Sequence, residues 1–190
     1  MNVSGILPFA RELLSRCIPD GGVAVDATAG KGNDTLFLAK LVGESGHVYS
    51  FDIQEQAILA TKDKLQLHEI EQRVELIHDG HENLEKYLKL NHKGLVNGAV
   101  FNLGYLPGSN KEIVTTPDTT IAAIEELLEN LVKGGIIVLV IYHGHPEGAV
   151  ERDQLLPYVR ELAQEDYHVL EYRFTNQQNN PPFIVAIEKR

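Results

Sequence analysis

The fold of this chain is decided by residues 23–34, whose sequence is VAVDATAGKGND. The apolar run Val23-Ala24-Val25 predicts a short buried strand, and a loop with Gly30 and Gly32 follows it. Glycine allows a tight turn and a close approach of the backbone to a ligand. A helical pattern over residues 33–42 comes next. Strand, glycine loop and helix in this order predict an α/β unit, whose loop is either a ligand-binding loop or only a tight strand-to-helix turn.

The rest of the chain repeats this alternation of apolar runs and longer helical patterns. Further strands are expected at residues 48–51, 74–77, 95–103, 136–142, 168–174 and 183–188, and further helices at 5–17, 55–69, 82–90, 118–132 and 148–165. Such alternation is typical of a parallel sheet with helices on both faces. No helix separates the last two strands, which predicts a terminal hairpin with one antiparallel strand. We therefore expect an α/β fold with a seven-stranded, mostly parallel sheet.

Length and composition indicate an ordinary globular protein with one domain over residues 1–190. Hydrophobic residues make up 43% and charged residues 23%, which excludes a disordered chain. The 17 Lys and Arg against 27 Asp and Glu give a net charge of −10, which disfavours broad binding to nucleic-acid phosphates. The single Cys17 indicates a reducing compartment. We expect neither a membrane span nor a signal peptide, and hence a cytoplasmic protein.

Aspartates follow the first three expected strands, at Asp26, Asp52 and Asp79. The carboxyl ends of parallel strands meet at one sheet edge, so these acids are expected at one site. That many negative charges would repel a pyrophosphate cofactor, and Thr35 stands where a dinucleotide fingerprint has its third glycine. S-adenosylmethionine, with a ribose diol, an adenine amino group, an ammonium and a sulfonium, fits these acids better. Each aspartate taken alone is equally well explained as a turn residue or a helix cap.

A set of cofactor contacts follows from this placement. The loop 28–34 is predicted to wrap the methionine part, with Asp26 near the ammonium group. Asp52 is predicted to bind the ribose hydroxyls, and Asp79 to accept from the adenine amino group. The complete predicted set is Asp26, Thr28, Gly30, Lys31, Gly32, Asn33, Asp34, Asp52, Gln54, Asp79, Gly80 and His81.

The fourth strand runs into residues 102–108, NLGYLPG, which resemble the Asn/Asp-Pro-Pro-Tyr motif of amino-group methyltransferases. A nitrogen nucleophile needs an acceptor that aligns its lone pair and an aromatic face that holds its base. The Asn102 side-chain oxygen and the Leu103 carbonyl are the candidate acceptors, and Tyr105 is the candidate stacking ring. Gly104 replaces a proline of that motif, and an ordinary Gly/Pro turn is the alternative interpretation.

Two histidines, His143 and His145, follow the fifth strand. With Asp79 or His81 nearby they raise the question of a metal site, but no cysteine pair or helical HExxH motif supports zinc. We expect no metal and assign both histidines to the substrate pocket, as candidate catalytic residues beside Asn102 and Tyr105. The sequence does not choose between the two.

Together these motifs resemble the YtqB-type rRNA methylase family over nearly the whole chain. The resemblance is carried by residues 26–34 (DATAGKGND), 51–54 (FDIQ), 78–81 (HDGH), 102–108 (NLGYLPG), 142–145 (YHGH) and 179–182 (NNPP). It implies a Rossmann-like class I methyltransferase and the tRNA activity called MnmM. That activity methylates 5-aminomethyl-2-thiouridine at the wobble position to 5-methylaminomethyl-2-thiouridine. The resemblance also implies a homodimer.

Other functions stay open on sequence alone. They are an rRNA or small-molecule methyltransferase, an NAD-dependent oxidoreductase, and a binding module without catalysis. If the partner is the tRNA anticodon region, so acidic a chain needs a local basic rim around its pocket. Lys31 and Lys111 flank the glycine loop and the Asn102 loop, and are the expected contributors. Recognition should favour a splayed single-stranded base stacked on an aromatic ring.

Overall fold

The computed structural model describes residues 2–104 and 115–190. The strands are β1 (Val23–Asp26), β2 (His47–Phe51), β3 (Val74–Ile77), β4 (Val96–Leu103), β5 (Leu131–Ile141), β6 (Tyr167–Tyr172) and β7 (Phe183–Lys189). The α-helices are α1 (Ile6–Cys17), α2 (Asn33–Leu41), α3 (Glu55–Leu67), α4 (Leu84–Tyr87), α5 (Pro117–Asn130) and α6 (Pro146–Arg160). Short 3₁₀ turns lie at Glu71–Arg73, His81–Asn83 and Leu90–His92.

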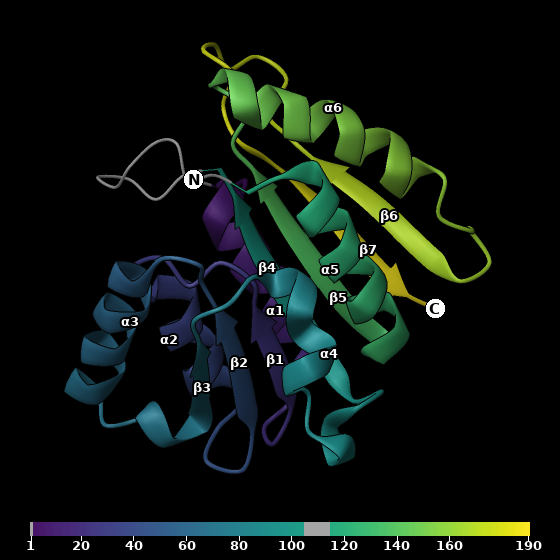
Figure 1. The fold of residues 1–190 in the computed structure, drawn as a ribbon. Coiled ribbons are helices and arrows are strands. Elements are labelled where there is room, and N and C mark those ends of the chain that lie inside the picture. Colours follow the sequence, from purple (N-terminus) through teal and green to yellow (C-terminus); the bar gives the residue numbers. More distant parts are fainter. Residues whose placement is uncertain (1, 105–114) are drawn as a thin grey trace.

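The strands form one sheet in the order β3-β2-β1-β4-β5-β7-β6 (Figure 1). Strands β1 to β5 pair in parallel, and β7 is antiparallel to both of its neighbours. The predicted seven-stranded, mostly parallel sheet with a terminal antiparallel hairpin is confirmed. The strand order reverses at β1, which lies between β2 and β4. At such a switch point, α/β sheets bind ligands beyond the carboxyl ends of their strands.

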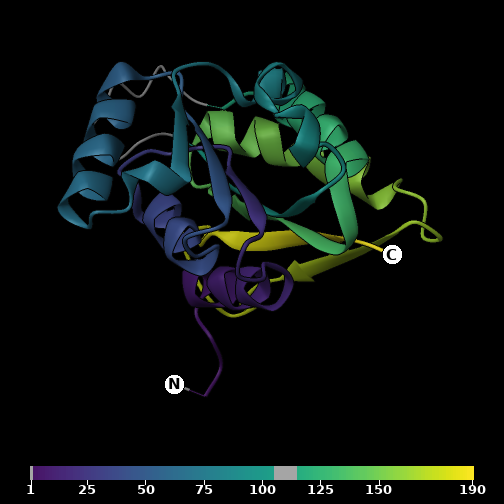
Figure 2. The same ribbon diagram turned by 90° about the horizontal axis from the view of Figure 1, so that it is seen from below.

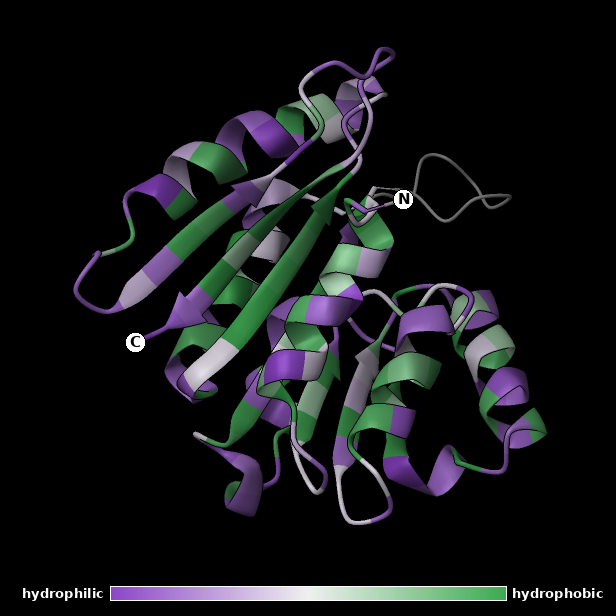
Figure 3. Cartoon of the chain, turned by 180° about the vertical axis from the view of Figure 1, so that it is seen from behind, coloured by the Kyte–Doolittle hydropathy of each residue, from purple (hydrophilic) through white to green (hydrophobic). Residues whose placement is uncertain are grey.

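Different helices cover the two faces of the sheet. In β5, Ile137, Leu139 and Ile141 pack into a core with α4, α5 and α6, whereas Val138 and Val140 pack with α1, α2 and α3. Figure 2 shows α1 and α6 on opposite sides of the sheet. Because successive strand residues point to opposite faces, a strand covered on both faces is apolar throughout, as the green central strands of Figure 3 show.

Strand β5 begins at Leu131, whereas the sequence predicts a helix to residue 132 and a strand from residue 136. The reason is a break in register against β4, where Val96 pairs with Leu131 but Gly98 pairs with Ile136. The extra residues of β5 form a bulge, and Gly134 within it has a left-handed φ of 79°. The glycine pair therefore bends a strand instead of ending a helix.

The extents of two helices also differ from the sequence prediction. Helix α6 begins at Pro146 because the His145 side chain caps it, with Nδ1 accepting from Gly148 N–H at 3.1 Å. This helix ends at Arg160 instead of continuing to residue 165. The helix expected over residues 82–90 is a 3₁₀ turn followed by the short α4. Beyond α4, the Lys89 N–H donates to the Tyr49 hydroxyl at 3.1 Å instead of to a helical carbonyl.

Candidate active site

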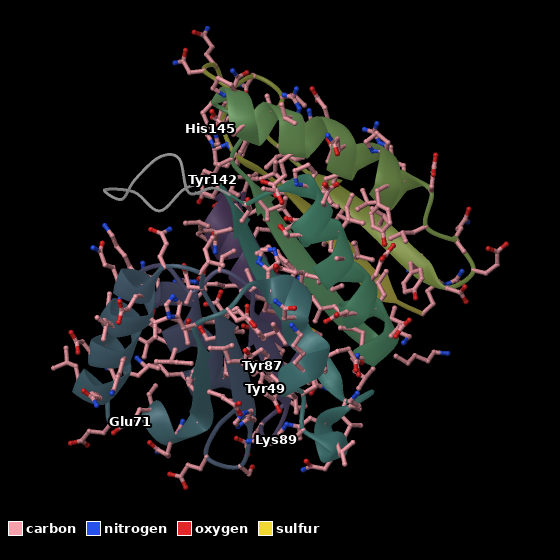
Figure 4. All side chains as sticks on the ribbon, in the orientation of Figure 1. Tyr49, Glu71, Tyr87, Lys89, Tyr142 and His145 are labelled. Carbon is pink, nitrogen blue, oxygen red and sulfur yellow. The ribbon has the colours of Figure 1, made fainter. Side chains whose placement is uncertain are left out.

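A cavity of about 500 Å³ opens at the carboxyl ends of β1, β4 and β5. Its walls are Leu7, Arg11, Thr28, Ala29, Gly30, Lys31, Asn33, Asp34, Asn102, Gly104, Tyr142, Gly144, His145 and Asn180. This volume is typical of a pocket for a small molecule or cofactor. Figure 4 shows Tyr142 and His145 at this end of the molecule, while Tyr49 and Lys89 lie at the opposite end.

The glycine loop is tied to the end of β2 through Asp52. Asp52 Oδ2 accepts from the Gly30 N–H at 2.9 Å, and Oδ1 accepts from the Gln54 N–H at 2.9 Å. Gly32 has a φ of 71°, and a Cβ there would lie 2.9 Å from the backbone Cα of Thr61 in α3. Only glycine therefore fits where the loop passes this helix. The loop and Asp52 meet at one sheet edge, in keeping with their positions in the sequence.

Asp26 lies beneath the glycine loop and is fully buried. Its Oδ1 accepts from the Thr28 N–H at 3.1 Å, and its Oδ2 accepts from the Thr35 hydroxyl at 2.6 Å. Burial, followed by the nearby Asp34 carboxylate, raises the pKa of Asp26 to about 7. Because both oxygens bind protein groups, Asp26 supports the loop from below. Its contact with the ammonium group of the cofactor stays a prediction.

The raised pKa of Asp26 predicts a specific pH dependence of stability. The folded protein holds this proton up to about pH 7, whereas an unfolded aspartate releases it near 3.8, so the stabilisation is lost as the pH rises through this window. In Asp26→Asn, the amide oxygen can accept from Thr28 N–H while its NH₂ donates to the Thr35 hydroxyl. We expect this variant to gain up to about 4 kcal/mol relative to wild type between pH 4 and pH 8. Urea unfolding at both pH values checks this, and an equal stability difference at the two would contradict it.

Asp79 and His81 lie beyond the end of β3. The Asp79 carboxylate accepts from the Tyr87 hydroxyl and the Gly80 N–H, both at 2.8 Å, and these bonds, that from Tyr87 first, lower the pKa of Asp79. His81 is buried, with Nδ1 2.9 Å from the Ala27 carbonyl oxygen, so Nδ1 carries the proton. Burial lowers the pKa of His81 and favours its neutral form.

Asp34 lies at the centre of a hydrogen-bonded group on the cavity wall. Its Oδ1 accepts from Arg11 Nε and Nη2 at 3.2 and 2.9 Å, and its Oδ2 accepts from Asn102 Nδ2 at 2.9 Å. The Asn102 backbone N–H donates to the Thr28 hydroxyl at 2.8 Å. These contacts connect α1, α2, the glycine loop and the end of β4. The Leu103 carbonyl, the second candidate acceptor, takes the Tyr142 N–H at 3.1 Å.

The structure separates the two candidate histidines. His145 lines the cavity, whereas His143 is not part of its lining. His143 Nε2 lies 3.0 Å from the Pro181 carbonyl oxygen, and Nδ1 lies 3.1 Å from Arg152 Nη1. A neutral imidazole with its proton on Nε2 satisfies both contacts, and burial, followed by the Arg152 charge, lowers the pKa of His143. Its ring thus holds Pro181 and the adjacent cavity residue Asn180.

The predicted site residues fall into groups. Thr28, Gly30, Lys31, Asn33, Asp34, Asn102 and His145 line the cavity. Asp26, Gly32, Asp52, Gln54, Asp79, Gly80, His81 and His143 lie outside its lining. Tyr105 and Lys111 lie outside the described residues.

Seven cavity residues were not predicted as site residues: Leu7, Arg11, Ala29, Gly104, Tyr142, Gly144 and Asn180. Tyr142 and Asn180 belong to motifs that carry the family resemblance, so a signal for them was present. Asn180 has a left-handed φ of 49°, an uncommon conformation that asparagine tolerates better than most residues. Leu7 and Arg11 carry no local signal, because only the packing of α1 beside the sheet brings them to the cavity.

Within residues 2–104 and 115–190, no group of three or more His, Cys, Asp or Glu is placed to hold a metal ion. In the same residues, no helix is long and apolar enough to cross a membrane.

This strand order, with the glycine loop after β1 and a carboxylate after β2, is the Rossmann-like fold of class I methyltransferases. A family model described as "Putative rRNA methylase" matches residues 48–188, and the chain belongs to this family. The resemblance inferred from the motifs is thereby confirmed.

Individual relatives agree with this assignment. A structure from Clostridium thermocellum, described as a "putative rRNA-methylase", is 42% identical over all of both chains, with a TM-score of 0.96. A structure from Streptococcus mutans, described as "a putative methyltransferase" in complex with SAH, is 40% identical over 99% of each chain, with a TM-score of 0.89. A protein of Arabidopsis thaliana, "tRNA (mnm(5)s(2)U34)-methyltransferase, chloroplastic", is 33% identical over 95% of this chain and 68% of its own length. The chain is an S-adenosylmethionine-dependent methyltransferase, as predicted.

Proposed function

We propose that this protein N-methylates RNA, converting 5-aminomethyl-2-thiouridine at the tRNA wobble position to 5-methylaminomethyl-2-thiouridine. The observation that carries nitrogen methylation is the Asn102 carboxamide, fixed on the cavity wall beside the glycine loop. The tRNA substrate is supported by the name of the Arabidopsis relative, which specifies mnm(5)s(2)U34. The description of the family model supports rRNA as the alternative substrate.

The proposed reaction is a single methyl transfer. S-adenosylmethionine supplies a methyl group made electrophilic by its sulfonium. A protonated alkyl amine has no lone pair, so the aminomethyl group must first lose a proton to water or a nearby base. A nitrogen–carbon bond then forms as the carbon–sulfur bond breaks, and S-adenosylhomocysteine leaves as a neutral thioether. The product is a secondary ammonium ion, which exchanges one proton with solvent. The Asn102 oxygen orients the amine by accepting a hydrogen bond from one of its N–H groups, and most of the rate enhancement comes from this positioning.

We propose that Tyr142 and His145 line the part of the cavity that receives the substrate. Tyr142 lines the cavity and is partly buried, and burial raises the pKa of its hydroxyl, which keeps the ring neutral. A neutral aromatic ring there offers a stacking face for a base, a role that the sequence assigned to Tyr105. We favour His145 over His143 near the substrate because His145 lines the cavity.

The substrate is tested by nucleoside mass spectrometry of RNA from a strain that lacks this protein. We expect its tRNA to accumulate 5-aminomethyl-2-thiouridine and to lose the methylated nucleoside. Re-expression of the wild-type chain should restore the methyl group, whereas Asn102→Ala should not. An unchanged tRNA profile together with a lost rRNA methyl group would favour the rRNA alternative.

RNA binding is expected to depend on basic residues at the cavity rim. Lys31 lines the cavity, and Lys64 of α3 donates a hydrogen bond to the neighbouring Asn33. With about three phosphate contacts, the logarithm of affinity for an anticodon stem-loop should fall with the logarithm of salt concentration with a slope near −2. Lys31→Ala/Lys64→Ala removes two of these contacts and should make this slope shallower by about 1.4.

A matched control is Lys40→Ala/Lys133→Ala, which removes the same charge from exposed lysines away from the cavity lining. Equal slopes for the two double variants would place the RNA footprint elsewhere. Absence of RNA binding at any salt concentration would favour a small-molecule substrate. The homodimer stays a prediction, and light scattering of the purified protein measures it.

A further inference from the structure

We infer that Asp34, held by Arg11, is a positioning residue that sets the direction of the Asn102 carboxamide, so that its oxygen faces the substrate amine. This inference rests on the proposed role of Asn102 and gives Asp34 a different role from the cofactor contact that the sequence predicts. Neither Asp34 nor Arg11 takes part in the transfer itself. Their function is to decide which end of the Asn102 amide the substrate meets.

Each oxygen of the Asp34 carboxylate has its own hydrogen-bond partner, which fixes the orientation of this side chain. Arg11 binds Oδ1 through two nitrogen atoms, and Asn102 Nδ2 binds Oδ2 at 2.9 Å. The Asp34 side chain is 17% exposed, so solvent screens these contacts less than it would at the surface. The position of Asn102 itself is fixed from behind, where its backbone N–H donates to the Thr28 hydroxyl.

A carboxylate only accepts hydrogen bonds, whereas a carboxamide donates at one end and accepts at the other. Asn102 must therefore offer its NH₂ to Asp34, because the flipped amide would place two acceptor oxygens against each other. Among residues 2–104 and 115–190, no hydrogen bond is made to Asn102 Oδ1. Since Asn102 lines the cavity, this oxygen is the acceptor left for a ligand.

The direction of the amide matters for nitrogen methylation. An oxygen accepts an N–H of the amine and leaves the nitrogen lone pair free to attack, whereas an NH₂ would itself donate to that lone pair and block it. Arg11 has a second consequence. By occupying Asp34 Oδ1, it prevents this carboxylate from holding the substrate as the unreactive ammonium ion.

A reciprocal exchange tests the inference. Asp34→Asn allows the Asn102 amide to flip, and Asn102→Asp places two carboxylates face to face. We expect each single variant to lower kcat by about 10²-fold, the scale for loss of one aligned polar group, with S-adenosylmethionine Kd within about threefold of wild type. In Asp34→Asn/Asn102→Asp the hydrogen bond re-forms in the opposite direction, and residue 102 again offers the substrate an oxygen.

The double variant should recover about tenfold in kcat over either single variant, because the two sites are directly coupled. Its activity optimum should move to higher pH, since the new carboxylate at position 102 favours the ammonium form of the amine. The matched control is Asp118→Asn, which removes an exposed first-turn aspartate from α5 and should leave kcat unchanged. Thermal unfolding of every variant separates loss of fold from loss of activity.

A second readout does not depend on the substrate. In ¹⁵N-labelled protein, the side-chain NH₂ resonances of Asn102 should shift in Asp34→Asn and stay unchanged in Asp118→Asn. Unchanged Asn102 resonances in Asp34→Asn would overturn the inference even if the RNA substrate proves to be different.

The activity measurements have outcomes of their own. If Asp34→Asn binds the cofactor more weakly but keeps the wild-type kcat at saturation, Asp34 acts as a cofactor contact and the inference is wrong. Absence of recovery in the double variant would show that the direction of this hydrogen bond is not what matters. By contrast, wild-type turnover in Asn102→Ala would remove the proposed role of Asn102 itself.

Discussion

Replacement of Asn102 by alanine is expected to lower kcat for the RNA substrate by about 10²–10³-fold, the range seen when one aligned polar group is lost from a site. The carboxamide is the polar group that the end of β4 presents in the cavity, with its NH₂ bound to Asp34 and its oxygen left for a ligand. Alanine removes the acceptor that orients the amine, so the nitrogen meets the methyl carbon in fewer productive geometries.

Single-turnover methylation and calorimetric titration together check this prediction. S-adenosylmethionine Kd should stay within about threefold of wild type, because the loss concerns orientation of the amine. Asn176→Ala, in an exposed loop outside the cavity lining, is the matched control and should keep full turnover. Near-wild-type turnover in Asn102→Ala would exclude this side chain from the mechanism.

Replacement of Asp52 by alanine is expected to weaken S-adenosylmethionine binding by about 10²-fold or more. A ribose diol would donate two charge-assisted hydrogen bonds to this carboxylate, each worth about 1.5–3 kcal/mol. The substitution also releases the Gly30 and Gln54 N–H groups, both of which now donate to Asp52 at 2.9 Å. The glycine loop therefore loses its tie to β2 in the same variant.

Two further variants separate these effects. Asp52→Asn keeps an acceptor oxygen and should fall between wild type and Asp52→Ala in affinity. Asp63→Asn, an exposed aspartate on α3, controls for the change in net charge. Isothermal titration with S-adenosylmethionine measures all of them, and an affinity for Asp52→Ala equal to that of wild type would remove Asp52 from the cofactor site.

Sequence alone predicts the sheet and the position of the site at its edge well. The reason is that burial on two faces makes a strand segment such as residues 136–141 of β5 continuously apolar, and parallel strands bring their carboxyl ends together. The start of β5 could not be predicted, because a glycine pair ends a helix or bends a strand equally well. Only the pairing of Val96 and Gly98 with β5 decides between the two.

Site residues that reach the cavity only through tertiary packing could not be predicted from the sequence. Arg11 reaches Asp34 only because α1 packs beside the sheet, and no local pattern on that helix marks it. His143 and His145 lie two residues apart in the chain, yet their contacts differ. Pro181 and Arg152 contact the two ring nitrogens of His143, whereas His145 caps helix α6. Contacts between distant segments make these distinctions, and spacing along the chain does not reveal them.

Methylation of a defined anticodon stem-loop by the purified protein tests the central claim most directly. The stem-loop carries either 5-aminomethyl-2-thiouridine or plain uridine at the wobble position, and mass spectrometry of the nucleosides locates the new methyl group. The account predicts 5-methylaminomethyl-2-thiouridine from the first substrate, no product from the second, and a large loss of product with Asn102→Ala. Methylation of the plain uridine, or of an atom other than the aminomethyl nitrogen, would contradict it. So would an aminomethyl group that stays unmethylated under conditions where the wild-type protein binds S-adenosylmethionine.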